Sequence, residues 1–241
     1  MKHLSKTLLF FLIIGVLVSC GREEVESSEK RNFVQRDVIG DWSLQISDNN
    51  TSIDGYNGFN KTLVIPQFVE DKEIKGVSEY VIGSGFKVER GKSIVTKLDF
   101  SSNSNLTAHS IGVFANFTKV KEIVFNDNLV LIDRFAFPDC ISLDSLRFPH
   151  GLQNIGDNAF NNCSNLVYVE LNPNLLNIEE HVFSDCKNIS NVILTRATAP
   201  LTKCDSSSFE MGVIDSIFYP KGMNYPELPG WDNYDVVWEE Y

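Results

Sequence analysis

The sequence has few cysteines and little positive charge. Five cysteines among 241 residues are too few for a small fold held together by disulfides. Only 21 Lys and Arg residues stand against 32 Asp and Glu residues, which gives a formal net charge of −11 and a pI near 4.8. Phosphate binding requires clustered Lys and Arg, so this balance argues against a nucleic-acid partner. The length and the 43% hydrophobic content suit one or two globular domains with a sizeable core.

Familiar catalytic and metal-binding motifs are missing as well. The chain contains no C-x-x-C pair, no H-E-x-x-H motif, no nucleophile elbow, no P-loop and no dinucleotide-binding motif. His109, His150 and His181 lie in different parts of the sequence without the spacing of metal ligands. We therefore expect no enzymatic activity, no metal and no cofactor.

The first 19 residues have the features of a bacterial lipoprotein signal peptide. Lys2 and Lys6 precede an apolar run from Leu8 to Val18, which at 11 residues is too short to span a membrane. The run ends in Leu17-Val18-Ser19-Cys20, which resembles the lipobox at which a bacterial lipoprotein is lipidated on cysteine. An ordinary secretory signal that ends near a cysteine is the alternative. We expect Cys20 to carry the lipid, and the acidic body to contact the membrane only through that lipid.

Residues 20–32 are polar, charged and without periodicity, which predicts a flexible acidic tether behind the lipidated cysteine. Glu23 and Glu24 resemble the acidic export signal that directs lipoproteins of some anaerobic Gram-negative bacteria to the cell surface. An ordinary solvated linker is the other interpretation. The sequence thus predicts an outer-membrane lipoprotein exposed at the cell surface, with the periplasmic face as the alternative location.

The rest of the chain contains an internal repeat. Three consecutive units of 23 residues hold six apolar slots in register. The slots are Ile132, Ile155 and Ile178; Phe137, Phe160 and Phe183; Cys140, Cys163 and Cys186; Leu143, Leu166 and Ile189; Leu146, Val169 and Val192; and Phe148, Leu171 and Leu194. Less regular units extend the pattern over residues 61–200, and a degraded last unit lies at Ile217. Together they predict seven rungs.

Each unit contains a short strand. Within residues 143–148, polar and apolar side chains alternate from Ser145 to Phe148, so successive residues there point to opposite faces. The segment that follows, from isoleucine to phenylalanine, is short and turn-like. One unit cannot bury its own apolar face, whereas stacked units bury a continuous core. This predicts a solenoid with about seven short parallel strands that form one exposed sheet.

The repeated cysteines occupy a packing position. The unit before them has Phe117 in the same slot, and a slot that accepts phenylalanine is buried and apolar. Parallel side chains on adjacent rungs do not point at each other as a disulfide requires. We therefore favour core packing for this slot over a disulfide or a metal site. Cys204 falls outside the pattern and has no predicted place.

The repeat, with its F..C..L..L.L/P....L..I pattern, resembles the BspA-like leucine-rich repeats of bacterial surface proteins over roughly residues 60–220. Residues 33–60 resemble the β-hairpin cap that precedes such repeats, and residues 201–241 resemble a degraded last repeat with an irregular C-terminal cap. Trp42 at one end, and Trp231 and Trp238 at the other, are large enough to cover the ends of the core. The resemblance implies an adhesin-like role with a host-protein or cell-surface partner.

Two columns of side chains are expected to face outward from the sheet. The first is Thr62, Lys97, Glu122, Ser145, Tyr168 and Asn191; the second is Val64, Asp99, Val124, Arg147, Glu170 and Ile193. Asp99 and Glu122, on neighbouring rungs, have a separation compatible with a glycosidase carboxylate pair. An open sheet does not desolvate them, however, and Lys97 beside them would stabilise the charged form of both. Arg147 next to Glu170 predicts a cross-strand ion pair.

We interpret the columns as a protein-binding surface. Its candidate residues are Lys97, Asp99, Glu122, Ser145, Arg147, Tyr168, Glu170 and Asn191. Tyr168 and Arg147, near the centre, are residue types enriched in binding hot spots. A merely solvated sheet is one alternative. Another is an accessory or structural subunit of an outer-membrane glycan-uptake assembly.

Overall fold

The computed structural model describes residues 35–47, 50–77, 87–88, 94–106, 114–195, 203–209, 214–221 and 237–241. The chain divides into two compact units, Met1–Arg31 and Asn32–Tyr241, and every described residue lies in the second. The expected signal peptide, the lipidated Cys20 and the tether lie outside the described residues, as do His109, Trp231 and the side chain of Trp238. Within the described part of the chain, no helix is long and apolar enough to cross a membrane.

The described chain begins with an antiparallel β-meander, in line with the expected N-terminal cap. Its strands are β1 (Gln35–Ile39), β2 (Trp42–Ser47) and β3 (Asn50–Tyr56), joined to β7 (Gly76–Val77) and β8 (Lys87–Val88), which pair with β3 in parallel. Gly40 adopts a φ of 59° in the two-residue turn between β1 and β2, where glycine avoids steric strain. Leu44 and Ile53 are fully buried and belong to the same core as the repeats.

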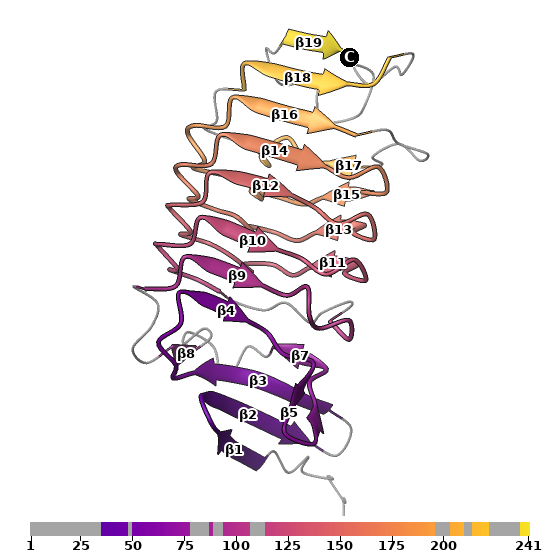
Figure 1. The fold of residues 1–241 in the computed structure, drawn as a ribbon. Helices are drawn as coiled ribbons and strands as arrows, with labels where there is room; N and C mark the ends of the chain where they lie inside the picture. Colours follow the sequence, from indigo (N-terminus) through magenta and orange to yellow (C-terminus); the bar gives the residue numbers. More distant parts are fainter. Residues whose placement is uncertain are drawn as a thin grey trace, which may run out of the picture. The chain divides into compact units, whose positions relative to one another are not determined.

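The repeats stack as parallel strands along one face (Figure 1). The strands of this face are β4 (Thr62–Val64), β9 (Lys97–Asp99), β10 (Glu122–Val124), β12 (Ser145–Arg147), β14 (Tyr168–Leu171), β16 (Asn191–Leu194), β18 (Ser216–Tyr219) and β19 (Val237–Glu240). The pairing sets Lys97 against Glu122 and Ser145 against Tyr168, which confirms the expected register of the columns. A leucine-rich-repeat solenoid is therefore the fold. Strand β19 adds one parallel strand from the C-terminal segment for which we expected irregular structure.

The structure refines the expectation of one exposed sheet. Strands β4, β9 and β10 form one ladder, and strands β12, β14, β16, β18 and β19 form another. Among the described residues no backbone pairing joins β10 to β12, although 23 residues separate Glu122 from Ser145 as they separate Ser145 from Tyr168. A separate small hairpin, β5 (Phe68–Val69) and β6 (Lys72–Glu73), lies in the long segment between β4 and β9.

A second parallel sheet forms where sequence analysis expected only turns. It contains β11 (Leu131–Ile132), β13 (Asn154–Ile155), β15 (Asn177–Ile178) and β17 (Lys203–Cys204), whose repeated isoleucines pair in register. Cys204 pairs with Ile178 and so takes the isoleucine slot of the last rung. The segment after each isoleucine is a turn, as expected. Residues with positive φ in that segment prevent it from forming a helix.

A stack of phenylalanine rings runs through the core. Phe114, Phe137, Phe160, Phe183 and Phe209 follow one another with ring centroids 5.5, 5.4, 5.7 and 4.9 Å apart and interplanar angles of 11 to 22°. All five side chains are buried. The stack contains the predicted phenylalanine slot, and Phe209 extends it by one rung.

The repeated cysteines are free and buried, as the packing interpretation predicts. The Cys163 thiol lies 3.5 Å from the Phe137 carbonyl oxygen, and the Cys186 thiol lies 3.1 Å from that of Phe160. Each thiol therefore donates a hydrogen bond to a backbone carbonyl of the neighbouring rung. Burial raises the pKa of the Cys204 thiol to about 12.

Buried asparagines, which sequence analysis missed, form further bonds between rungs. The side-chain amides of Asn126 and Asn172 donate to the carbonyl oxygens of Leu106 and Leu152, at 2.9 and 3.0 Å. Their side-chain oxygens accept from backbone N–H groups two residues later, so each asparagine also closes its own turn. Such bonds satisfy backbone groups that burial would otherwise leave unpaired.

We predict that Phe160→Ala lowers the free energy of unfolding by about 3–5 kcal/mol, because it removes a ring stacked on both sides and leaves a cavity. Denaturant unfolding measures the loss. Phe59→Ala is the matched control, since Phe59 is 67% exposed and its removal should change stability by less than about 0.5 kcal/mol. Equal effects of the two changes would contradict the ring stack as the centre of the core.

We also predict that Cys140, Cys163, Cys186 and Cys204 resist a thiol reagent at pH 8 in the native protein. The burial of all four excludes the reagent, and the Cys204 thiol, with its pKa of about 12, is in addition ionised in only about one molecule in ten thousand at that pH. Mass spectrometry after alkylation, with and without denaturant, measures the difference. Rapid native labelling of any of the four would show that the rungs open.

Candidate binding surface

Lys97, on the second strand of the outward columns, joins two carboxylates. Its ammonium nitrogen lies 2.9 Å from a Glu122 carboxylate oxygen and 3.8 Å from one of Asp99. The hydrogen bond to Glu122 is the main cause of the raised pKa of Lys97. Asp99 also accepts hydrogen bonds from the backbone and hydroxyl of Ser101. The two acids proposed for a glycosidase pair are thus bridged by a cation, which suits a structural ion-pair network.

A second cluster lies on β12 and β14. An Arg147 guanidinium nitrogen lies 3.1 Å from a Glu170 carboxylate oxygen, which the Tyr168 hydroxyl also contacts at 2.9 Å. The guanidinium carbon lies 5.5 Å from the centre of the Tyr168 ring, a cation–π distance. Burial and the bond to Glu170 raise the pKa of Tyr168. The expected cross-strand pair is present, and the tyrosine joins it.

The two remaining candidates have contacts near their own strands. The Ser145 hydroxyl donates to Asp144, and the Asn191 amide donates to the Ser190 hydroxyl. The structure therefore brings together Lys97, Asp99 and Glu122 in one cluster and Arg147, Tyr168 and Glu170 in another. Ser145 and Asn191 join neither.

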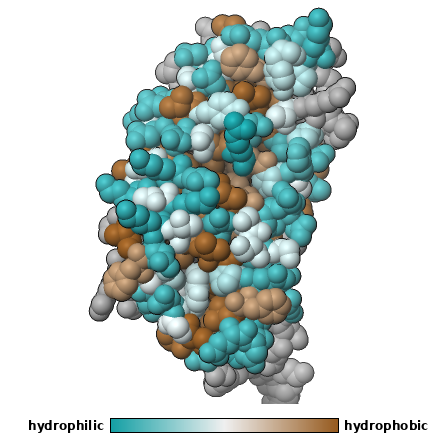
Figure 2. Space-filling model, in the orientation of Figure 1, coloured by the Kyte–Doolittle hydropathy of each residue, from teal (hydrophilic) through white to brown (hydrophobic). Residues whose placement is uncertain are grey.

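A cleft of about 480 Å³ lies between the two clusters, where β10 and β12 are unpaired; we call it the β10/β12 cleft. Apolar atoms of Ile123, Phe125 and Phe148 contribute to its lining, together with residues of both strands. Asp127 and Pro149 line it as well. Figure 2 shows that hydrophobic patches reach an otherwise largely hydrophilic surface on this side of the molecule.

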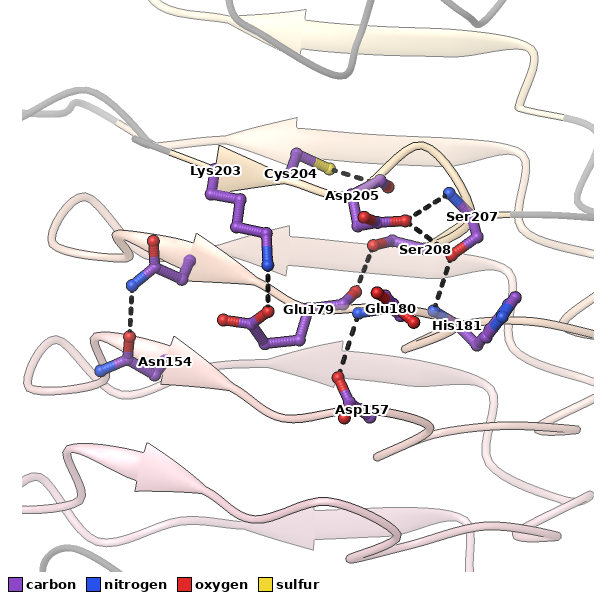
Figure 3. Close-up of polar contacts among 11 residues, drawn as sticks. Asn154, Asp157, Glu179, Glu180, His181, Lys203, Cys204, Asp205, Ser207 and Ser208 are labelled. Atoms are coloured by element: carbon purple, nitrogen blue, oxygen red, sulfur yellow. Dashed lines mark hydrogen bonds and ion pairs between the residues drawn. The ribbon is translucent and has the colours of Figure 1, made fainter.

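The second sheet has its own polar contacts, drawn in Figure 3. Lys203 forms an ion pair with Glu179, and Asn177 donates to Asn154 at 2.6 Å. Hydrogen bonds from Ser207 lower the pKa of Asp205. These contacts join successive rungs or close turns. In the part of the chain that the structure describes, no group of three or more His, Cys, Asp or Glu side chains is arranged to hold a metal ion.

Residues 99–227, more than half of the chain, match six copies of the BspA-type leucine-rich repeat region. The chain belongs to the BspA-type leucine-rich-repeat family. No curated protein matches it. Three solved structures of leucine-rich-repeat proteins are similar to it at low sequence identity.

A leucine-rich-repeat protein of T. pallidum is 19% identical, with 89% of this chain and 86% of that chain covered and a TM-score of 0.45. One from Bacteroides ovatus is 15% identical, covers 86% and 70%, and has a TM-score of 0.41. A leucine-rich cell-surface protein from Faecalibacterium prausnitzii is 14% identical, covers 85% and 94%, and has a TM-score of 0.35.

Sequence analysis missed the β10/β12 cleft of this BspA-type surface. Sequence analysis compared the positions that recur in every repeat, whereas the β10/β12 cleft lies in a repeat that lacks two recurring asparagines. Pro149 and Gly151 stand where the neighbouring units have asparagines, at Asn126 and Asn128 and at Asn172 and Asn174. That departure was the available signal. With its exposed strands, the BspA-type solenoid presents an extended face of the kind that mediates protein binding.

Proposed function

We propose that this BspA-type protein is a lipid-anchored, cell-surface module with an adhesin-like role, and that its outward strands bind a protein partner. The observation that carries the proposal is the Arg147–Tyr168–Glu170 cluster on the exposed ladder. Family membership supports protein binding in general terms, by analogy with how repeat solenoids use their exposed face.

The cluster has the physical properties of a binding anchor. The Arg147 side chain is 74% exposed, whereas the side chain of its ion-pair partner Glu170 is only 27% exposed. The ion pair therefore fixes an exposed guanidinium to a more buried carboxylate. The tyrosine ring also contacts the guanidinium, through the cation–π interaction. A partner would therefore meet a tyrosine and an arginine that are already positioned, so little side-chain entropy is lost on binding.

The proposed membrane attachment rests on the sequence. Leu17-Val18-Ser19-Cys20 supplies a lipidation motif, and Glu23 and Glu24 supply a candidate export signal. A body with a large excess of Asp and Glu is repelled by anionic headgroups, so attachment through acyl chains on Cys20 suits its charge.

Catalysis on the same face has weaker support. A carboxylate that acts as a general acid needs a raised pKa in a desolvated site. Asp99 and Glu122 instead share the ammonium of Lys97. We therefore propose binding rather than hydrolysis for these strands.

We predict that replacing Arg147 and Tyr168 together with alanine weakens binding to the captured partner at least about tenfold. The partner is first captured from host-cell or bacterial-envelope extracts with the purified protein, and affinities are then measured by biolayer interferometry. Lys187→Ala is the control, because Lys187 is an exposed lysine whose ion pair among the described residues is with a near neighbour, Asp185. Unchanged affinity of the double variant, with its fold intact, would contradict the role of the cluster.

We predict that protease added to intact cells removes residues 33–241, and that Cys20→Ala releases the protein from the membrane fraction. Replacing Glu23 and Glu24 with glutamine should protect the repeats from the protease if the two acids direct export. Immunoblots of shaved cells and of membrane fractions measure both effects. Protection of the unaltered protein until the outer membrane is opened would contradict surface exposure. Co-purification with an outer-membrane transporter would then favour the accessory-subunit alternative.

A further inference from the structure

Strands β18 and β19 extend the outward columns beyond β16, where the columns expected from the sequence ended. In one column Phe218 pairs with Ile193, and Glu239 pairs with Phe218. In the other column Val237 pairs with Ser216, so it lies diagonally across from Phe218. Neighbouring strands are about 4.8 Å apart, which brings the apolar side chains of three successive strands side by side on the exposed face.

These apolar side chains reach the solvent. Ile193 and Phe218 are half-buried, and Val237 and Tyr241 are 59% and 60% exposed. The Tyr241 hydroxyl donates to the Leu194 carbonyl at 3.4 Å, so this side chain extends from the end of β19 across β18 to β16. Figure 2 shows hydrophobic residues at the upper end of this face. We call Ile193, Phe218, Val237 and Tyr241 the C-terminal apolar patch.

The rest of the exposed face is more polar. Its first strands carry Lys97, Asp99 and Glu122, which form ion pairs with one another, and its middle carries the ion pair of Arg147 with Glu170. The C-terminal apolar patch offers mainly carbon atoms in their place. Scattered apolar residues are normal on a protein surface, whereas adjoining ones on neighbouring strands mark an interaction site.

The charges around the patch favour a cationic occupant. Residues 214–241 contain six Asp and Glu residues against one lysine. Asp215 and Glu239 are exposed, and neither forms an ion pair with the described residues. The Ser216 hydroxyl donates to the Glu239 carboxylate at 2.8 Å, which holds that charge beside the strand of Phe218. A second copy of this acidic chain, or an anionic membrane, would be repelled.

We infer that the C-terminal apolar patch docks a segment of the partner protein in which apolar side chains are flanked by Lys or Arg. The apolar side chains pack on Ile193, Phe218 and Val237, and the cations lie near Asp215 and Glu239. Removal of apolar atoms from water provides the affinity, and the acids select the sign of the partner's charge. This inference rests on the proposed protein-binding function and names the part of the partner that is recognised.

The test uses the full chain and capped, fluorescein-labelled octapeptides with Leu, Phe or Tyr at the two central positions and Lys or Arg at both ends. We expect saturable binding in fluorescence polarisation, with shifts in the methyl NMR signals of Ile193 and Val237. Peptides with Glu at the ends, or with Ser at the centre, should bind at least about tenfold more weakly. Higher salt should also weaken binding, because it screens the exposed acids.

Variants of the patch separate its apolar and acidic parts. Exchange of Ile193 and Phe218 together for serine should weaken peptide binding at least about tenfold, and Glu239→Gln should weaken it about threefold. Phe59→Ser and Asp71→Asn are the matched controls, because both residues precede β9, Phe59 is 67% exposed and the Asp71 side chain is 87% exposed. Both controls should leave binding unchanged.

A milder variant keeps the test valid if the double serine variant fails to fold. Val237→Ser alters a side chain that is 59% exposed on the last strand, and it should weaken peptide binding about threefold without lowering Tm by more than a few degrees. Failure of every peptide to bind, or equal binding of the Lys-ended and Glu-ended peptides, would overturn the proposal. Self-association in sedimentation that Val237→Ser abolishes would assign the patch to a second copy and overturn it as well.

The captured partner distinguishes the patch from the cluster. Partner binding that depends on Arg147 and Tyr168 but is unchanged in the serine variants would refute the patch and leave the proposed function standing. Partner binding that is lost in the serine variants, with affinity unchanged in the double alanine variant, would refute the cluster alone.

Discussion

Burial of each rung by its neighbours is the constraint on which the rest of the structure depends. A 23-residue unit has too little depth to enclose its own apolar side chains, so they are covered only when the next unit repeats them in register. Parallel strands repeat at about 4.8 Å, close to the spacing of offset stacked rings. The phenylalanine stack, with centroids about 5 to 6 Å apart, satisfies both spacings together. The outward columns and the polar clusters follow from that register.

The features predictable from sequence are those that recur. Apolar residues two apart identify the strands and assign each outward residue to a column, and the 23-residue period pairs Ser145 with Tyr168 and Arg147 with Glu170. The second sheet could not be predicted in this way, because its strands contain two residues and cannot show alternation. Cys204 escaped prediction for a related reason, since a small thiol replaced isoleucine in a slot identified only by isoleucine.

For the candidate surface, the sequence predicted which residues are neighbours on adjacent strands. It did not predict how their side chains contact one another. Register places Arg147 beside Glu170, but the position of the guanidinium against the Tyr168 ring depends on side-chain rotamers that no period specifies. The buried asparagines were harder still, because asparagine is common in exposed turns and only the backbone shows that Asn126 and Asn172 reach into the next rung. Without that knowledge, Pro149 and Gly151 look like ordinary turn residues.

An opening in one ladder is tolerable because rungs contact one another on more than one side. Across the β10/β12 cleft, Phe114 still stacks on Phe137, Phe125 stacks on Phe148, and β11 still pairs with β13. The core and the second sheet therefore continue where the exposed ladder does not. In a solenoid the cost of such an opening stays within one interface between neighbours, since distant rungs do not contact it.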